Sequence, residues 1–121
     1  MSDAPSPPPL PERTPADFFA LDLRVGTVVA AEPFPEARKP AIRLTIDFGP
    51  VLGRRRSSAQ LTTHYAPETL VGRQVVAATN IGTRRIAGFV SEVLVLGAMP
   101  GATEVVLLAP DHPVANGTKI G

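Results

Sequence analysis

The alternation of apolar and polar residues from position 42 to position 48 constrains the fold of this chain more than any other feature. Every second residue there is apolar, and the residues between are Arg43, Thr45 and Asp47. A period of two is typical of a β-strand with one face in a core and the other in water. Glycine and proline at 49–53 predict a turn into an antiparallel partner over residues 54–61, with a polar outer face.

Further strands are predicted over residues 21–31, 74–79, 92–96 and 104–109, with short helical turns over 17–21 and 62–72. Gly26 lies inside the first of these strands and predicts a bend or bulge there. Five or six short strands with a helical interruption after the third are typical of a partly open Greek-key barrel. We therefore predict an all-β fold, a five-stranded OB-fold barrel with short helical segments.

Six prolines within the first fifteen residues set that segment apart from the rest of the chain. Such a density of proline is incompatible with a packed helix or sheet, so residues 1–15 are predicted to form a disordered, extended arm. Residues 16–121 are predicted to form one domain, because 121 residues with 44% apolar content suffice for a single core.

Composition excludes several classes of protein. The formal net charge is only +1, so no overall field draws the chain to nucleic acid or to an anionic membrane. The chain has no cysteine, which excludes disulfides and thiolate chemistry. It has no signal-like start and no apolar run of membrane-spanning length, so we expect a cytoplasmic protein with no membrane insertion.

Seven of the twelve basic residues fall in three short clusters that could lie on one rim of the barrel. The clusters are Arg38 with Lys39, then Arg54, Arg55 and Arg56, and finally Arg84 with Arg85. An arginine pair beside a strand can hold phosphates or carboxylates, because each guanidinium offers a planar fork of donors. The alternative is that these cations only keep loops solvated.

Polar and aromatic side chains near these clusters are further candidates for ligand binding. Ser57, Ser58, Gln60 and Asn80 carry hydroxyl or amide groups that could bond a peptide backbone or a nucleotide. The alternative is that they satisfy nearby backbone groups of the chain itself. Phe34 lies beside the first basic pair and is either a stacking platform or a simple loop anchor.

No pattern in the sequence indicates bond-making chemistry. The glycines do not form a phosphate-binding loop, and neither histidine has the spacing of a metal ligand. Ser57 and His64 lack the nucleophile-elbow motif and the orienting acid of a hydrolase. We therefore predict a protein that is not an enzyme, with no catalytic residues, no metal and no cofactor.

Several linked motifs carry a specific resemblance. They are FPEARKPAI at 34–42, IDFG at 46–49, SSAQ at 57–60, RRIAGF at 84–89, SEVLVLG at 91–97 and the ending PVANGTKIG at 113–121. Together they resemble the CsaA family of small bacterial and archaeal export-related chaperones. That family belongs to the same OB-fold superfamily as the tRNA-binding appendix of methionyl-tRNA synthetases. The resemblance covers about residues 16–121 and leaves the proline-rich arm outside.

The resemblance implies a homodimer that binds unfolded or precursor polypeptides and passes them to the export motor. Apolar residues at Phe18, Phe19 and across 105–120 agree with a dimer in which the terminal segments of each subunit cover the other. The alternative function is binding of tRNA or structured RNA. The tRNA-binding appendices usually have lysine, methionine and arginine where this chain has Arg85, Ile86 and Ala87, which argues against a direct transfer of tRNA affinity.

Overall fold

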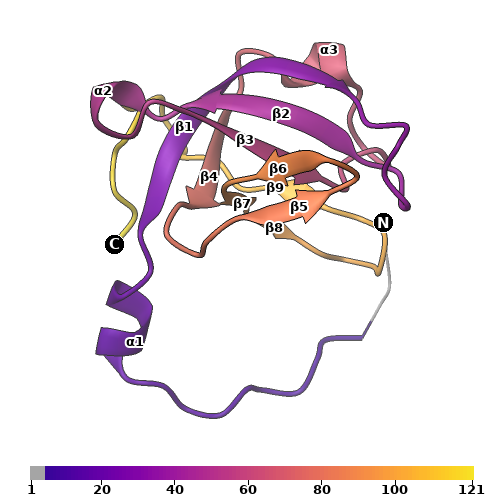
Figure 1. Ribbon diagram of the computed structural model, residues 1–121. Helices are drawn as coiled ribbons and strands as arrows, with labels where there is room; N and C mark the ends of the chain where they lie inside the picture. The colour runs from indigo at the N-terminus through magenta and orange to yellow at the C-terminus, as the bar shows by residue number, and fades with distance from the viewer. Residues whose placement is uncertain (1–4) are drawn as a thin grey trace.

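A five-stranded antiparallel sheet, coiled into a barrel, dominates the fold of residues 5–121, the part of the chain that this computed structural model describes (Figure 1). The strands run in the order β3-β2-β1-β4-β7. Their bounds are Leu23–Pro33 for β1, Ile42–Asp47 for β2, Arg54–Ala59 for β3, Gln74–Ala78 for β4 and Leu94–Val95 for β7. A bond from Glu92 N to Arg56 O nearly closes the barrel, which confirms the predicted OB-like fold.

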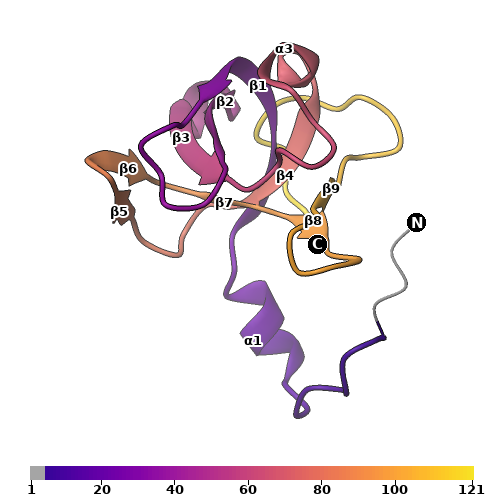
Figure 2. The ribbon, with the colours of Figure 1, turned by 90° about the vertical axis from the view of Figure 1, so that its right-hand side faces the viewer.

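Two small sheets and three short helices complete the structure. β5 (Arg84–Ile86) pairs with β6 (Phe89–Ser91), and β8 (Gly97–Ala98) pairs with β9 (Val106–Leu107). The helices are α1 (Pro15–Phe19), α2 (Gly49–Leu52) and α3 (Pro67–Leu70). The β5–β6 hairpin stands out from the barrel in Figure 2 and was not predicted. The strands predicted over 92–96 and 104–109 are shorter than expected.

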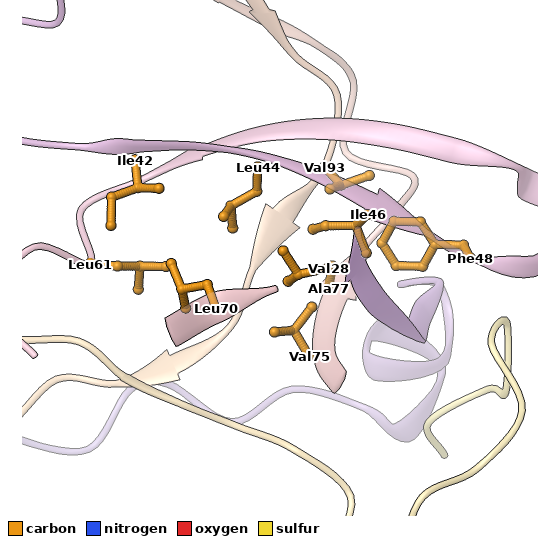
Figure 3. Close-up of a cluster of buried hydrophobic side chains, with 10 residues drawn as sticks. All are labelled: Val28, Ile42, Leu44, Ile46, Phe48, Leu61, Leu70, Val75, Ala77 and Val93. Atoms are coloured by element: carbon orange, nitrogen blue, oxygen red, sulfur yellow. The ribbon is translucent and has the colours of Figure 1, made fainter. Parts of the chain in front are cut away.

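The alternating residues of β2 point into the barrel as predicted. Ile42, Leu44, Ile46 and Phe48 are each no more than 1% exposed. They meet side chains from β1, β4 and α3, together with Leu61 before α3 and Val93 before β7, as Figure 3 shows. Each aliphatic side chain that is fully buried in this way contributes about 1.5–3 kcal/mol.

Gly26 serves packing rather than the predicted bulge. It pairs in regular register with Val75, and the register shift of β1 lies between Val28 and Ala30 instead. A Cβ atom at Gly26 would lie 2.6 Å from Ile46 Cγ2 and 2.8 Å from the Phe48 ring. The missing side chain therefore leaves room for the largest residue of the core.

The segment before the barrel ends in a well-capped helix. Thr14 caps α1 through a reciprocal pair of bonds with Asp17, and Pro15 occupies the first turn. No residue of α1 is buried, and Figures 1 and 2 both show the helix apart from the barrel. Residues 5–14 are all exposed and form neither helix nor strand. Residues 1–4 of the predicted arm lie outside the described residues, and the mobility of the arm stays a prediction.

Residues 117–120 take the place of β2 beside the first residues of β1. Val25 N donates to Thr118 O at 2.9 Å, Gly117 N donates to Val25 O at 2.7 Å, and Ile120 N donates to Leu23 O at 2.9 Å. Since β4 pairs with the other edge of β1, the first strand is enclosed on both sides.

Asp22 and Arg24 fasten the start of β1 to this segment. Arg24 Nε donates to Asp22 Oδ1 at 2.6 Å, and Arg24 Nη1 donates to Gly117 O at 3.1 Å. The Arg24 guanidinium, through this hydrogen bond and its charge, holds the pKa of the Asp22 carboxyl below its usual range. The carboxylate form of Asp22 is therefore the one that the fold favours.

This pKa shift predicts an acid-sensitive contribution to stability. Since the folded pKa of Asp22 lies below its unfolded value of about 3.9, the contribution is complete at neutral pH and is lost as pH falls through the folded pKa. We expect Asp22→Asn to lower the free energy of unfolding at pH 7 and to make little difference in strong acid. Urea denaturation of both proteins from pH 7 to pH 2 measures this. A constant gap between them would contradict the assignment.

Candidate functional site

A row of arginines lies on the outer face of β2 and β3. Arg43 is opposite Ser58, Thr45 is opposite Arg56, and Asp47 is opposite Arg54. The residues between them on β2 are buried, so these six side chains point away from the core. We call them the β2–β3 face.

The strand alternation divides the predicted cluster of Arg54, Arg55 and Arg56. Arg54 and Arg56 belong to the β2–β3 face, whereas Arg55 pairs with Ile46 and turns to the other side. There Arg55 Nε donates to Leu52 O at 3.0 Å. Arg55 therefore holds the turn around α2 and does not extend the basic row.

The β5–β6 hairpin lies against β3 and adds to this face. Ser58 N donates to Ser91 Oγ at 3.1 Å, and Arg56 N donates to Glu92 Oε1 at 3.0 Å. Arg84 pairs with Ser91 and so shares its side of the hairpin, while Arg85 pairs with Val90 on the opposite side. The two guanidiniums do not form one fork.

Phe34 and Phe89 form a small aromatic cluster that two arginines cover. The ring centroids are 5.4 Å apart, and the guanidinium carbon of Arg43 lies 5.1 Å from the Phe34 centroid. The guanidinium carbon of Arg56 lies 4.8 Å from the centroid of the Phe89 ring. Phe34 is only 3% exposed, so it is a loop anchor, and the stacking-platform interpretation is wrong because no free ring face remains.

Acidic side chains accompany the arginines of the β2–β3 face. Glu32 Oε1 lies 3.3 Å from Arg43 Nη2, and Glu92 Oε1 lies 4.0 Å from Arg56 Nε. Asp47 stands opposite Arg54. These neighbours reduce the positive potential of the row, which therefore suits mixed polar contacts better than a purely anionic polymer.

The remaining basic residues of the three clusters are exposed and form no ion pair with any residue between positions 5 and 121. They are Arg38, Lys39, Arg54, Arg84 and Arg85. The loop with Arg38 and Lys39 precedes Ile42, at the far end of β2 from the position opposite Arg54. The sequence suggested that the three clusters could share one rim of the barrel. The structure instead spreads them along the β2–β3 face and the hairpin.

Two of the four polar candidates satisfy backbone groups. Ser57 is 1% exposed and its Oγ donates to Val93 O at 3.0 Å. Asn80 Oδ1 accepts from Asp22 N at 2.7 Å, and its Nδ2 donates to Ala20 O at 2.9 Å. These bonds use the side-chain groups of both residues within the chain. Ser58 on the β2–β3 face and the exposed Gln60 stay available to a ligand.

A cleft of about 530 Å³ is lined by Thr27 of β1, Tyr65, residues 72–74 at the start of β4, and residues between 107 and 113. Its apolar walls include Tyr65, Leu107 and Pro113, and its polar groups include Arg73 and Gln74. Gln74 bonds Val114 through both ends of its amide, at 2.7 Å and 3.0 Å, which fixes the outer wall. Sequence reasoning missed this cleft, because its residues come from four separate stretches without a shared pattern.

A second surface is apolar and uncovered. β8 pairs with β9, and Leu108 N bonds Leu96 O, so the outward side chains of β7, β8 and β9 share one face. Several large apolar side chains of this face and of the neighbouring segments are more than one third exposed. They are Leu21, Ile81, Leu94, Met99, Val106 and Leu108, and with Phe18 and Phe19 of α1, which stands apart from the barrel, we call them the apolar surface.

The hairpin turn contains an unusual residue. Ala87 has φ of 46° and Gly88 has φ of 82°, the signs that a two-residue type I′ turn requires. A left-handed conformation costs a residue with a Cβ about 1–2 kcal/mol. We expect Ala87→Gly to stabilise the hairpin by about 1 kcal/mol, measured as slower hydrogen exchange of its amides. Faster exchange would show that the turn is not strained.

Metal-binding clusters and membrane-spanning helices are both absent from the described residues. Between positions 5 and 121, no group of three or more His, Asp or Glu side chains is arranged to hold a metal ion. In the same range, no helix is both long enough and apolar enough to cross a membrane.

Comparison with known proteins defines the class of this domain. Residues 23–119 match the family described as "Putative tRNA binding domain". The chain is 39% identical over 104 residues to a methionine–tRNA ligase of Porphyromonas gingivalis and 40% identical over 113 residues to methionine–tRNA ligase 1 of Sorangium cellulosum. These regions cover 86% and 93% of this chain but only 15% and 16% of the ligases. The barrel is thus an OB-like domain of the tRNA-binding type.

Solved structures narrow the class. The chaperone CsaA of Bacillus anthracis is 57% identical with a TM-score of 0.88, covering 92% of this chain and 100% of that one. The CsaA chaperone protein of Picrophilus torridus is 42% identical with a TM-score of 0.84, covering 91% and 100%. The chain belongs to the CsaA family.

Proposed function

We propose that this protein is an export-related chaperone that binds unfolded or precursor polypeptides as a cytoplasmic homodimer and passes them to the export motor. The observation that carries the proposal is the 57% identity to a CsaA chaperone over the whole of that chain. The function needs binding and release of polypeptide, with no catalytic residue and no cofactor.

The cleft offers a site for apolar side chains of a client. Tyr65, Leu107 and Pro113 supply apolar walls, and Arg73 at the rim can meet a carboxylate. Its volume of about 530 Å³ is within the usual range of ligand sites. Ser58 and Gln60, whose side chains stay available, would bond the client backbone, which is the same for every sequence, and this suits a chaperone with many clients.

The apolar surface supports the homodimer. Monomeric proteins rarely expose contiguous apolar patches of more than a few hundred Å². α1 carries Phe18 and Phe19, which are 44% and 57% exposed, and none of its residues is buried. A second copy would cover these side chains together with Leu94 and Val106, as expected for a twofold interface. A monomer in analytical ultracentrifugation at micromolar concentration would contradict this arrangement.

Suppression of client aggregation tests the proposed function. A chemically denatured client is diluted into buffer with increasing amounts of the chain, and light scattering is recorded. Scattering should fall with the wild type and less with Ala109→Arg, which places a long charged side chain in the cleft. Ala102→Arg changes an exposed alanine outside the cleft and is the matched control. A client that aggregates equally with and without the chain would rule out the chaperone.

The second candidate is binding of tRNA or structured RNA, which the family match favours. Arg38, Lys39, Arg54, Arg84 and Arg85 would contact phosphates. If about four phosphates are neutralised, the logarithm of affinity falls against the logarithm of salt concentration with a slope of about −3. Polypeptide binding through apolar contacts should hardly respond to salt. An RNA affinity that Arg84→Ala and Arg85→Ala leave unchanged would remove these two residues from the site.

A further inference from the structure

The proline-rich arm has a backbone that its own sequence fixes. Every residue from 5 to 11 is either a proline or directly precedes one. Proline sets its own φ near −65°, and the residue before a proline is kept out of the helical region. These restrictions on φ and on the residues before proline favour the polyproline II conformation along seven consecutive residues. Thr14, which precedes Pro15, has φ of −86° and ψ of 157°, in the same region.

The described part of the arm is also exposed to solvent. Residues 5–14 are all exposed, and Leu10 is 89% exposed. No hydrogen bond or ion pair joins residues 5–13 to another residue that the structure describes. Figures 1 and 2 both show this part of the arm passing below the barrel as a separate segment. A polyproline II helix has no internal hydrogen bonds, so its carbonyl groups and rings are open to a partner.

The threefold repeat of this helix sorts the side chains onto three ridges. Pro5, Pro8 and Pro11 form one ridge, and Pro7, Leu10 and Arg13 form the next. The third ridge is Ser6, Pro9 and Glu12. The first two ridges are therefore apolar, and one of them ends in the cation of Arg13, whereas the third ridge mixes a serine, a proline and an acid.

We propose that residues 7–13 are a recognition segment for an aromatic-lined groove of the SH3 type in a second protein. Such grooves take the Pro-x-x-Pro pattern, here Pro8 and Pro11, and exploit a ligand that is already ordered. A carboxylate at the end of the groove would bind Arg13 and fix the direction of the segment. The proposal goes beyond the chaperone function, because it gives the arm a partner that is not a client.

The cleft of this chain is a poorer match to the segment than such a groove. Tyr65 is its one aromatic residue, and the guanidinium carbon of Arg73 lies 5.3 Å from that ring. Asp111 gives the cleft a carboxylate, but Arg73 belongs to the same lining and would repel Arg13, so the cleft offers neither several aromatic rings nor an anion without a competing cation. The partner is therefore a separate protein rather than this barrel.

Titration of the full-length chain with a purified SH3 domain that takes Pro-x-x-Pro-x-Arg ligands tests the proposal. Calorimetry should give saturable binding, weakened about tenfold or more by Pro8→Ala or Arg13→Ala, since a charge-assisted bond is worth more than about 1.4 kcal/mol. Pro9→Ala is the matched control, because it removes a proline from the third ridge and should change affinity less than about twofold.

Three outcomes would overturn the proposal. The first is no saturable binding. The second is an equal effect of Pro8→Ala and Pro9→Ala, which would make the segment only a stiff spacer. The third is a change in the NMR signals of Tyr65 and Ala109 when residues 2–13 are removed, which would place the arm in the cleft of its own protein.

Discussion

Gly117→Ala is expected to destabilise the protein by about 3 kcal/mol or more, the sum of a left-handed backbone penalty and a steric clash. Gly117 has φ of +90°, and a Cβ there would lie 2.6 Å from Phe48 O. Neither that carbonyl nor residue 117 can move freely, because Phe48 is buried in the core and Gly117 N donates to Val25 O. The free energy of unfolding from urea denaturation measures the effect.

Gly82→Ala separates the two contributions to this penalty. Gly82 has φ of +82° with nothing within 4 Å of a Cβ, so its substitution costs only the backbone term of about 1–2 kcal/mol. The difference between the two variants reports the contact between residue 117 and Phe48. Equal losses would show that residues 117–120 give way without cost and do not close the barrel tightly.

Leu94→Glu is expected to raise the dissociation constant of the proposed homodimer by about 100-fold or more. Leu94 is 53% exposed in the single chain and lies within the apolar surface. A carboxylate that is buried in the dimer interface without a partner would make the free energy of association less favourable by about 3–5 kcal/mol. Sedimentation velocity over a range of concentrations measures the dissociation constant directly.

Val51→Glu is the control for this experiment. Val51 is an apolar residue of α2 that is 87% exposed and lies outside the apolar surface. In Figure 1 α2 is at the other end of the barrel from α1. The control should leave the dimer intact, and a Leu94→Glu dimer as stable as the control would place the interface elsewhere.

Strand alternation predicted the core but not the hairpin. The inward residues of β2 follow from a period of two, which needs no knowledge of tertiary structure. The turn between β5 and β6 was missed because type I′ turns usually contain Asn-Gly or Asp-Gly, whereas here Ala87 precedes Gly88. Residues 84–96 therefore read as one loop and one strand.

The candidate site depends on contacts between distant parts of the chain. Ser57 points inward, as the register of its strand requires. Its hydrogen-bond partner, Val93 O, lies 36 residues further along the chain and could not be predicted from the pattern. Phe34 is covered by Phe89 and Arg43, which come from two other strands. The sequence was sufficient to find the basic residues. It did not show which residues lie beside them, so it could not predict that Arg84 and Arg85 fall on opposite faces of the hairpin.

The enclosure of β1 has a consequence for the biogenesis of this protein. A ribosome delivers residues 23–25 roughly ninety residues before residues 117–120, so in a nascent chain the start of the first strand lacks one of its two neighbours for most of the synthesis. Maturation is therefore a late event that follows translation of nearly the whole domain. A protein whose proposed task is to shelter immature polypeptides passes through a long immature stage of its own.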